Sequence, residues 1–288
     1  MTDVLYLQEQ PTSQEQLSST VSIDEVAKLF DVAHEFDDSE FEHTDRKMLS
    51  LELLSPTQTF KIQLFFIAVL VAASTIGQIG RHFYGATTMH GFIPFFYLDY
   101  EMNIPTYYSS IALLFASIML AAMTGISFKQ NARYRFHWAL LSATFGILAV
   151  DEVVGFHEYP IDAIRSYLGV GGMLYYAWVI PAAFCVFAFG LFFLKFLRDL
   201  PASTRYLFIL SGSIFVGGAI GVEMISGIEA DAAGEETLRY AAIITLEETM
   251  EMLGVALFTF AVYRELWKQV DVMFISMPNK QVLQAGAR

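Results

Sequence analysis

The stretch "HWALLSATFGILAVDEVVGFHE", residues 137–158, joins a long apolar run to a group of ionisable side chains. An α-helix needs about 20 predominantly apolar residues to cross the hydrocarbon core of a bilayer. The run therefore predicts a membrane-spanning helix over residues 137–157. Ionisable side chains inside such a helix are costly and indicate a functional site. The stretch carries four of them, which are Asp151, Glu152, His157 and Glu158.

Five further apolar runs have a similar length. They cover residues 62–84, 107–128, 173–197, 206–227 and 240–264. The whole chain has 288 residues, of which 55% are hydrophobic and 16% charged. This composition is too apolar for a soluble domain of that length. We therefore predict an all-α polytopic membrane protein with six transmembrane helices.

Basic residues gather in every second connection between the predicted spans. They are Lys129, Arg133, Arg135, Lys195, Arg198, Arg205, Arg264 and Lys268. Connections rich in lysine and arginine stay on the cytoplasmic side of a membrane. Both termini are then predicted to be cytoplasmic, and the loops 85–106, 158–172 and 228–239 face outward.

The predicted membrane domain, residues 60–265, lies between two cytoplasmic tails, residues 1–59 and 266–288. The N-terminal tail is acidic, because residues 1–58 hold 13 of the 30 aspartates and glutamates. It is predicted to contain one amphipathic helix over about residues 22–36, with capping-box spacing at its start and an apolar face. Anionic lipid would repel the acidic face of this helix, which favours docking on a cytoplasmic partner or on the cytoplasmic loops.

The charge and the cysteine content exclude several classes of function. A net charge of −13 excludes a nucleic-acid partner. The single cysteine, Cys185, excludes an intrachain disulfide framework and a cysteine-based metal site. The expected partner is the lipid bilayer, and the sequence leaves a membrane protein partner or a homo-oligomer open.

Polar side chains in the third predicted span are spaced seven residues apart, at His137, Thr144, Asp151 and Glu158. Seven residues turn an α-helix to within about 20° of two full turns. We therefore predict one polar stripe on this helix. A charged stripe at membrane depth must face protein or a water-filled cavity.

Two other predicted spans carry carboxylates at a similar depth. Glu223 lies in the fifth span, close to a Gly217-xxx-Gly221 spacing that would allow close approach of a neighbouring helix. The sixth span contains "TLEETMEMLG", in which at least two of the three glutamates share a face. The three spans together predict a carboxylate and histidine cluster in the outer half of the membrane.

So many carboxylates cannot all ionise in a medium of low dielectric constant, so protons or a bound cation must neutralise part of the charge. The predicted metal or cation ligands are Asp151, Glu152, His157, Glu158, Glu223, Glu247, Glu248 and Glu251. The predicted supporting polar residues are Gln78, Arg81, His82, His137, Thr144 and Arg239.

Three functions fit this cluster and stay open from the sequence. The first is a divalent metal site for iron, manganese or zinc, which extends to a metalloenzyme acting on a lipid-soluble or periplasmic substrate; no catalytic residue is assigned. The second is proton-coupled or cation-coupled transport. The third is a structural subunit of a membrane complex, in which Arg81, Arg165, Arg239 and His157 pair with the acids.

Four segments carry a resemblance to known sequences: "NIPTYYSSIALL", "DEVVGFHE", "LPASTRYLFILSGSIFVGGAIGVEM" and "TLEETMEMLGVALF". Together they resemble a group of uncharacterised bacterial multi-pass inner-membrane proteins, over about residues 60–265. The resemblance implies a location in the bacterial cytoplasmic membrane and a shared polar site. It implies no reaction.

Overall fold

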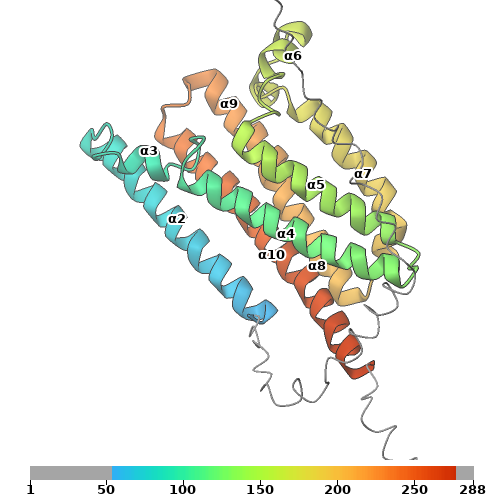
Figure 1. The fold of residues 1–288 in the computed structure, drawn as a ribbon. Coiled ribbons are helices and arrows are strands. Elements are labelled where there is room, and N and C mark those ends of the chain that lie inside the picture. The colour runs from blue at the N-terminus through green and yellow to red at the C-terminus, as the bar shows by residue number, and fades with distance from the viewer. Residues whose placement is uncertain (1–53, 277–288) are drawn as a thin grey trace, which may run out of the picture. The chain divides into compact units, whose positions relative to one another are not determined.

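A computed structural model describes residues 54–276, with side chains described as far as residue 269. Every element of regular structure in this range is helical (Figure 1). The amphipathic helix predicted over about residues 22–36 lies outside the described residues. The long helices are α2 (Pro56–Tyr84), α4 (Ile104–Lys129), α5 (Arg135–Val154), α7 (Val179–Asp199), α8 (Ala202–Val216) with its continuation α9 (Glu223–Ala233), and α10 (Leu238–Ser276).

Three short elements lie in the connections at one end of the helix bundle, which we call the α3 end. They are α3 (Phe92–Phe96), α6 (Ile161–Leu168) and the 3-10 turn η1 (Gly172–Leu174). The connection that contains α3 is folded against the bundle, because Tyr97 and Leu98 are both buried. Asn103 then caps α4 by accepting a hydrogen bond from the backbone N–H of Thr106 at 3.2 Å.

Five helices are long and apolar enough to cross a membrane, as an all-α membrane protein requires. They are α2, α4, α5, α7 and the continuous helix Ala202–Ala233. The helix α10 does not belong to this group, because its apolar part also carries three glutamates. It occupies the middle of the bundle and packs against α2, α4, α8 and α9 (Figure 1). Residues such as Ala261 and Val262 on α10 are fully buried.

The third long helix ends earlier than the sequence predicted. The helix α5 stops at Val154, and Gly155 takes the left-handed conformation with a φ of 64°. Glycine adopts this conformation without the steric penalty of a Cβ atom and commonly ends helices in this way. Glu158 therefore lies beyond the helix, and the prediction of one helical stripe from His137 to Glu158 is wrong past Asp151.

The continuous helix from α8 to α9 contains a π-helical segment, η2 (Gly217–Val222), where it crosses α10. A methyl group at Gly218 would lie 2.9 Å from the carbonyl oxygen of Glu247, whereas one at Gly221 would meet nothing within 4 Å. The close approach predicted at Gly217-xxx-Gly221 is thus made by Gly217 and Gly218 instead. On α10, a methyl group at Gly254 would lie 2.8 Å from the backbone nitrogen of Phe215.

The contact at Gly254 predicts a large effect for a small substitution. Gly254→Ala would force the backbones of α8 and α10 apart, and we expect a loss of about 1–3 kcal/mol in stability because overpacked contacts against backbone cannot relax. Gly125→Ala on α4 is the matched control, since its methyl group would meet nothing within 4 Å. The thermal midpoint of the detergent-solubilised protein should fall only for Gly254→Ala, and equal midpoints for the two variants would contradict the packing described here.

Candidate functional site

A cavity of about 1000 Å³ opens between α4, α5, α7, α8–α9 and α10. All eight residues predicted as ligands line it: Asp151, Glu152, His157, Glu158, Glu223, Glu247, Glu248 and Glu251. The sequence had placed them on three separate spans, and the fold brings them around one space, which we call the carboxylate cavity. Three further acids that were not predicted, Asp99, Glu101 and Glu235, also line it.

The turn at Gly155 brings His157 back onto the end of α5. The backbone N–H of His157 donates to Asp151 Oδ1 at 3.1 Å, and Nδ1 of its ring lies 2.7 Å from Asp151 Oδ2. The same ring packs on Trp178 at a centroid distance of 4.7 Å. The indole N–H of Trp178 donates to Glu223 Oε1 at 2.7 Å. This chain of contacts connects α5 to α9 across the cavity.

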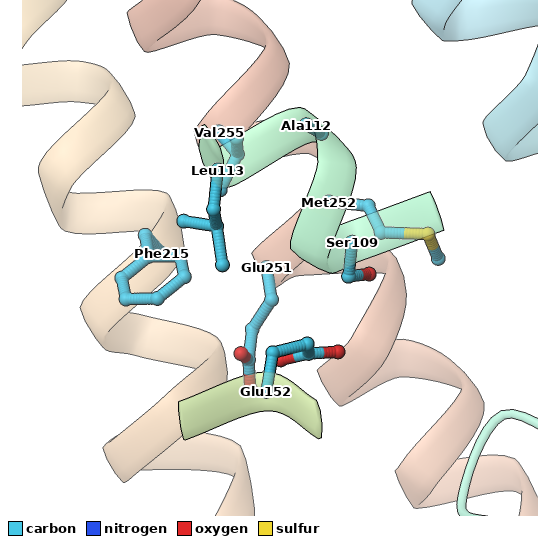
Figure 2. A pocket seen from close by; sticks show the side chains of 8 residues that line it. All are labelled: Ser109, Ala112, Leu113, Glu152, Phe215, Glu251, Met252 and Val255. Atoms are coloured by element: carbon cyan, nitrogen blue, oxygen red, sulfur yellow. The ribbon is translucent and has the colours of Figure 1, made fainter. Parts of the chain in front are cut away.

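The three glutamates of α10 that line the cavity are Glu247, Glu248 and Glu251. Glu247 is 7% exposed, and its Oε2 accepts a hydrogen bond from the Ser226 hydroxyl at 3.1 Å. Figure 2 shows the carboxylates of Glu251 and Glu152 side by side, with Ser109 next to them. A separate small pocket at this point has a volume of about 10 Å³, which is about the space one water molecule occupies.

The arginines predicted to neutralise this cluster pair with other acids. Arg81 bonds to Glu236. In the same way, Arg165 pairs with Asp162 at 2.5 Å and Arg239 with Glu229 at 3.2 Å. The prediction of a structural subunit required four basic residues to pair with the acids of the cluster. Within residues 54–269, only His157 among these four pairs with an acid of the cavity.

The remaining supporting residues do not form one group. Thr144 lines the cavity, and its hydroxyl donates to the Leu140 carbonyl at 2.9 Å. His137 lies at the opposite end of α5, stacked on Phe192 at 4.8 Å. Gln78 is buried in α2 with neither amide atom hydrogen-bonded within the described part of the chain. The last of them, His82, is half-buried near the end of α2.

A network that the sequence did not predict lies at the mouth of the cavity. The Tyr240 hydroxyl donates to Asp99 Oδ1 at 3.0 Å, the Tyr176 hydroxyl donates to Glu235 Oε1 at 2.9 Å, and the two hydroxyls are 2.9 Å apart. Three contacts need three protons, but two hydroxyls supply only two. All three contacts can be hydrogen bonds only when one of the two carboxyl groups carries a proton. Burial raises the pKa of Asp99 to about 6, although the bond from Tyr240 opposes this shift.

No three Asp, Glu, His or Cys side chains in the described part of the chain are arranged to hold a metal ion. The carboxylates form the wall of a wide space. A cation larger than a bare metal ion, or one with its own hydration shell, fits this geometry better than an ion held by direct ligands. Three converging ligands would require side chains such as Glu152, Glu248 and Glu251 to change rotamer.

The raised pKa of Asp99 predicts how stability depends on pH. The unfolded carboxyl titrates near pH 3.9 and the folded one near 6, so the folded state binds more protons between these values and stability falls as pH rises through them. Asp99→Asn should remove this loss and raise stability at pH 7.5 by up to about 3 kcal/mol, with little change at pH 4. Thermal midpoints between pH 4 and 8 measure the effect. Asp162→Asn is the control, because Asp162 is exposed. If the control is stabilised at pH 7.5 in the same way as Asp99→Asn, the assignment is wrong.

Comparison with known proteins identifies a matching family. A family model described as "Domain of unknown function (DUF8692)" matches residues 63–265. A search of curated proteins found no match, and a search of solved structures found none either. The matched range runs from α2 to α10 and includes every residue of the predicted ligand set. Because the match covers well over half of its length, this chain belongs to the DUF8692 family.

Proposed function

We propose that this protein spans the bacterial inner membrane six times, with α10 as the sixth span and with both termini in the cytoplasm. The arrangement of the basic connections supports this topology. Arg133, between α4 and α5, pairs with Asp199 at the end of α7 at 3.1 Å, and Gln130 bonds to Gln269 of α10 at 3.4 Å. The basic connections thus lie together at the end opposite α3, as the positive-inside rule requires of a cytoplasmic face.

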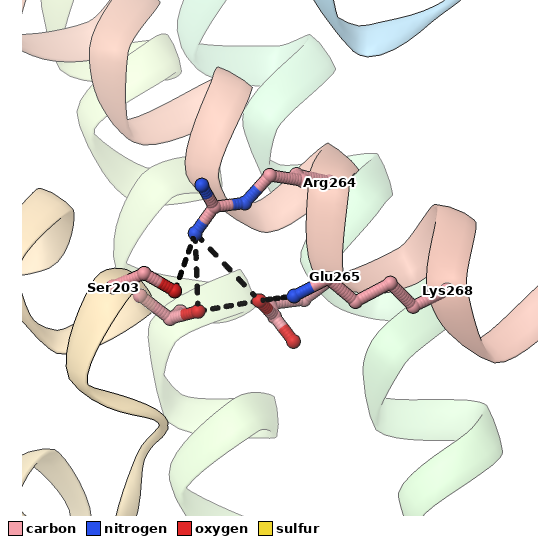
Figure 3. Close-up of polar contacts among 5 residues, drawn as sticks. Ser203, Arg264, Glu265 and Lys268 are labelled. Atoms are coloured by element: carbon pink, nitrogen blue, oxygen red, sulfur yellow. Dashed lines mark hydrogen bonds and ion pairs between the residues drawn. The ribbon is translucent and has the colours of Figure 1, made fainter.

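The C-terminal part of α10 adds to this basic face. Figure 3 shows Arg264 reaching the hydroxyl of Ser203 on α8, while Lys268 pairs with Glu265 at 2.7 Å. The Arg264 guanidinium also donates to the Thr204 hydroxyl at 3.4 Å. These polar groups anchor α10 to α8 at the proposed cytoplasmic boundary. The carboxylate cavity then opens toward the outer half of the membrane.

The topology predicts that the C-terminal end of α10 and the connection before α3 lie on opposite sides of the membrane. A fluorescent protein fused after Ser276 should be fluorescent in the cytoplasm, and alkaline phosphatase fused there should be inactive. Phosphatase inserted after Thr88, in the connection before α3, should be active. Phosphatase activity at Ser276 would overturn the topology and the outward placement of the cavity.

Within this topology, we propose that the carboxylate cavity binds a cation. The observation that supports this most strongly is its charge balance. Ten carboxylates line the cavity, and among the lining residues that the structure describes the only basic side chain is His157. Uncompensated carboxylates in apolar surroundings are costly, and a bound cation offsets that cost.

The glutamates of α10 are the proposed centre of the site. Glu248 and Glu251 share one face of the helix, three residues apart, and Glu152 of α5 lies beside Glu251 (Figure 2). Iron, manganese or zinc would be held there only after these carboxylates converge. A metalloenzyme acting on a lipid-soluble or periplasmic substrate is the catalytic form of this proposal, in which a remaining acid would shuttle protons.

Small cations test the proposal directly. Detergent-solubilised protein, freed of metal by a chelator, is titrated at pH 7.5 with Mn²⁺, Fe²⁺, Zn²⁺ or methylammonium. A cation that binds only the folded protein should raise the thermal midpoint by about 5–10 °C at one hundred times its dissociation constant. Metal analysis of protein purified without a chelator shows which metal, if any, is retained.

Two glutamine variants locate the binding. Glu248→Gln combined with Glu251→Gln should abolish the rise, because the amides keep the shape and remove the charge. Glu229→Gln is the control, since Glu229 pairs with Arg239 and does not line the cavity. If no cation raises the midpoint of the wild type, or if the double variant responds like the wild type, the proposal is wrong.

A further inference from the structure

The carboxylate cavity is much larger than a small cation needs. Its charged residues occupy only the α3 end, and away from them the wall is mainly apolar and aromatic, with the hydroxyl residues Thr144, Ser211 and Ser213 as its polar members. Phe145, Phe189, Phe193, Phe208 and Phe258 line this second part, which we call the aromatic half. A small cation at the glutamates would leave the aromatic half unused.

Two antiparallel helices set this change from charged to apolar lining. Along α10, the lining passes from Glu248 and Glu251 to Val255 and Phe258. Along α8 and α9, read in the opposite direction, it passes from Glu223 to Phe215 and on into the same apolar region. The two helices run antiparallel, so the charged parts meet at one end and the apolar parts at the other.

The wall between α7 and α8 is thin. Cys185 and Gly190 on α7 and Gly212 on α8 all line the cavity and are all exposed. A methyl group at Gly190 or Gly212 would meet nothing within 4 Å. Exposed small residues on two neighbouring apolar helices leave a path from the lipid into the cavity, whereas a ligand entering from water would pass the carboxylates first.

We infer that the cavity binds an amphiphile with a cationic head group and a single hydrocarbon chain, a long-chain amine being the simplest case. This inference rests on the proposed cation site and names its ligand. The ammonium group lies at Glu248 and Glu251, where it offsets charge that no lysine or arginine of residues 54–269 balances. The chain fills the aromatic half, whose apolar side chains can pack against hydrocarbon that arrives from the lipid. A neutral lipid would fill the aromatic half but leave the carboxylates without a counter-ion.

The single cysteine reports whether the cavity is filled. The protein is placed in phosphatidylcholine nanodiscs, and modification of Cys185 by N-ethylmaleimide is followed by intact mass. Hexadecylamine at a low mole fraction should slow the modification about tenfold. Hexadecanol at the same mole fraction controls for effects of the chain on the bilayer, and methylammonium for effects of the head group. Native mass spectrometry provides a second readout, a one-to-one adduct with hexadecylamine.

Two sets of variants separate the head group from the chain. Glu248→Gln with Glu251→Gln should abolish both protection by hexadecylamine and the adduct. Gly190→Phe and Gly212→Phe place a ring where the structure leaves space, so they should block the chain while the response to small cations stays that of the wild type. The adduct is the readout for these two variants.

The outcomes distinguish this inference from the proposal beneath it. If small cations stabilise the protein but hexadecylamine gives neither protection nor an adduct, the inference is wrong and the cation site stands. Equal protection by hexadecanol would overturn the cationic head group. If neither small cations nor hexadecylamine bind, both fail together.

Discussion

The constraint on which the rest of the structure depends is that carboxylates cannot face lipid. Three glutamates lie in the apolar part of α10, and a carboxylate surrounded by hydrocarbon is costly. The helix that carries them therefore lies in the middle of the bundle, with the more apolar helices around it. The same constraint opens the cavity, because side chains that cannot be packed in hydrocarbon need polar neighbours or space for a counter-ion.

Much of this arrangement can be predicted from sequence because apolar length and helical period are local properties. Five of the six predicted spans coincide with helices long and apolar enough to cross a membrane. The sequence predicted similar depths for Asp151, Glu223 and Glu248, and the fold places all three around the cavity. The end of α5 was missed although Gly155 signals it, since the apolar run continues past the glycine and conceals the turn.

Other parts of the site depend on contacts between distant segments and have no local signal. Asp99 meets Tyr240 across 141 positions of sequence, and nothing near either residue predicts the other. The partners of the arginines are equally nonlocal, as Arg81 reaches Glu236 rather than the acids at its own depth. The sequence therefore suggested more basic side chains near the cluster than the fold provides. The fold shows that these arginines pair with acids outside the cavity.

The π-helical segment before Glu223 sets the register of everything that follows it in α9. A π-turn holds one residue more than an α-turn, and one residue corresponds to about 100° of rotation. In the register that the extra residue creates, Glu223 accepts the hydrogen bond from Trp178, and Ser226 donates to Glu247 of α10. Deletion of a single residue from Gly217–Val222 would convert this segment into regular α-helix. Glu223 would then turn by about 100° and no longer face Trp178. The number of residues in Gly217–Val222 therefore matters as much for the position of the carboxylate as the presence of a glutamate at position 223.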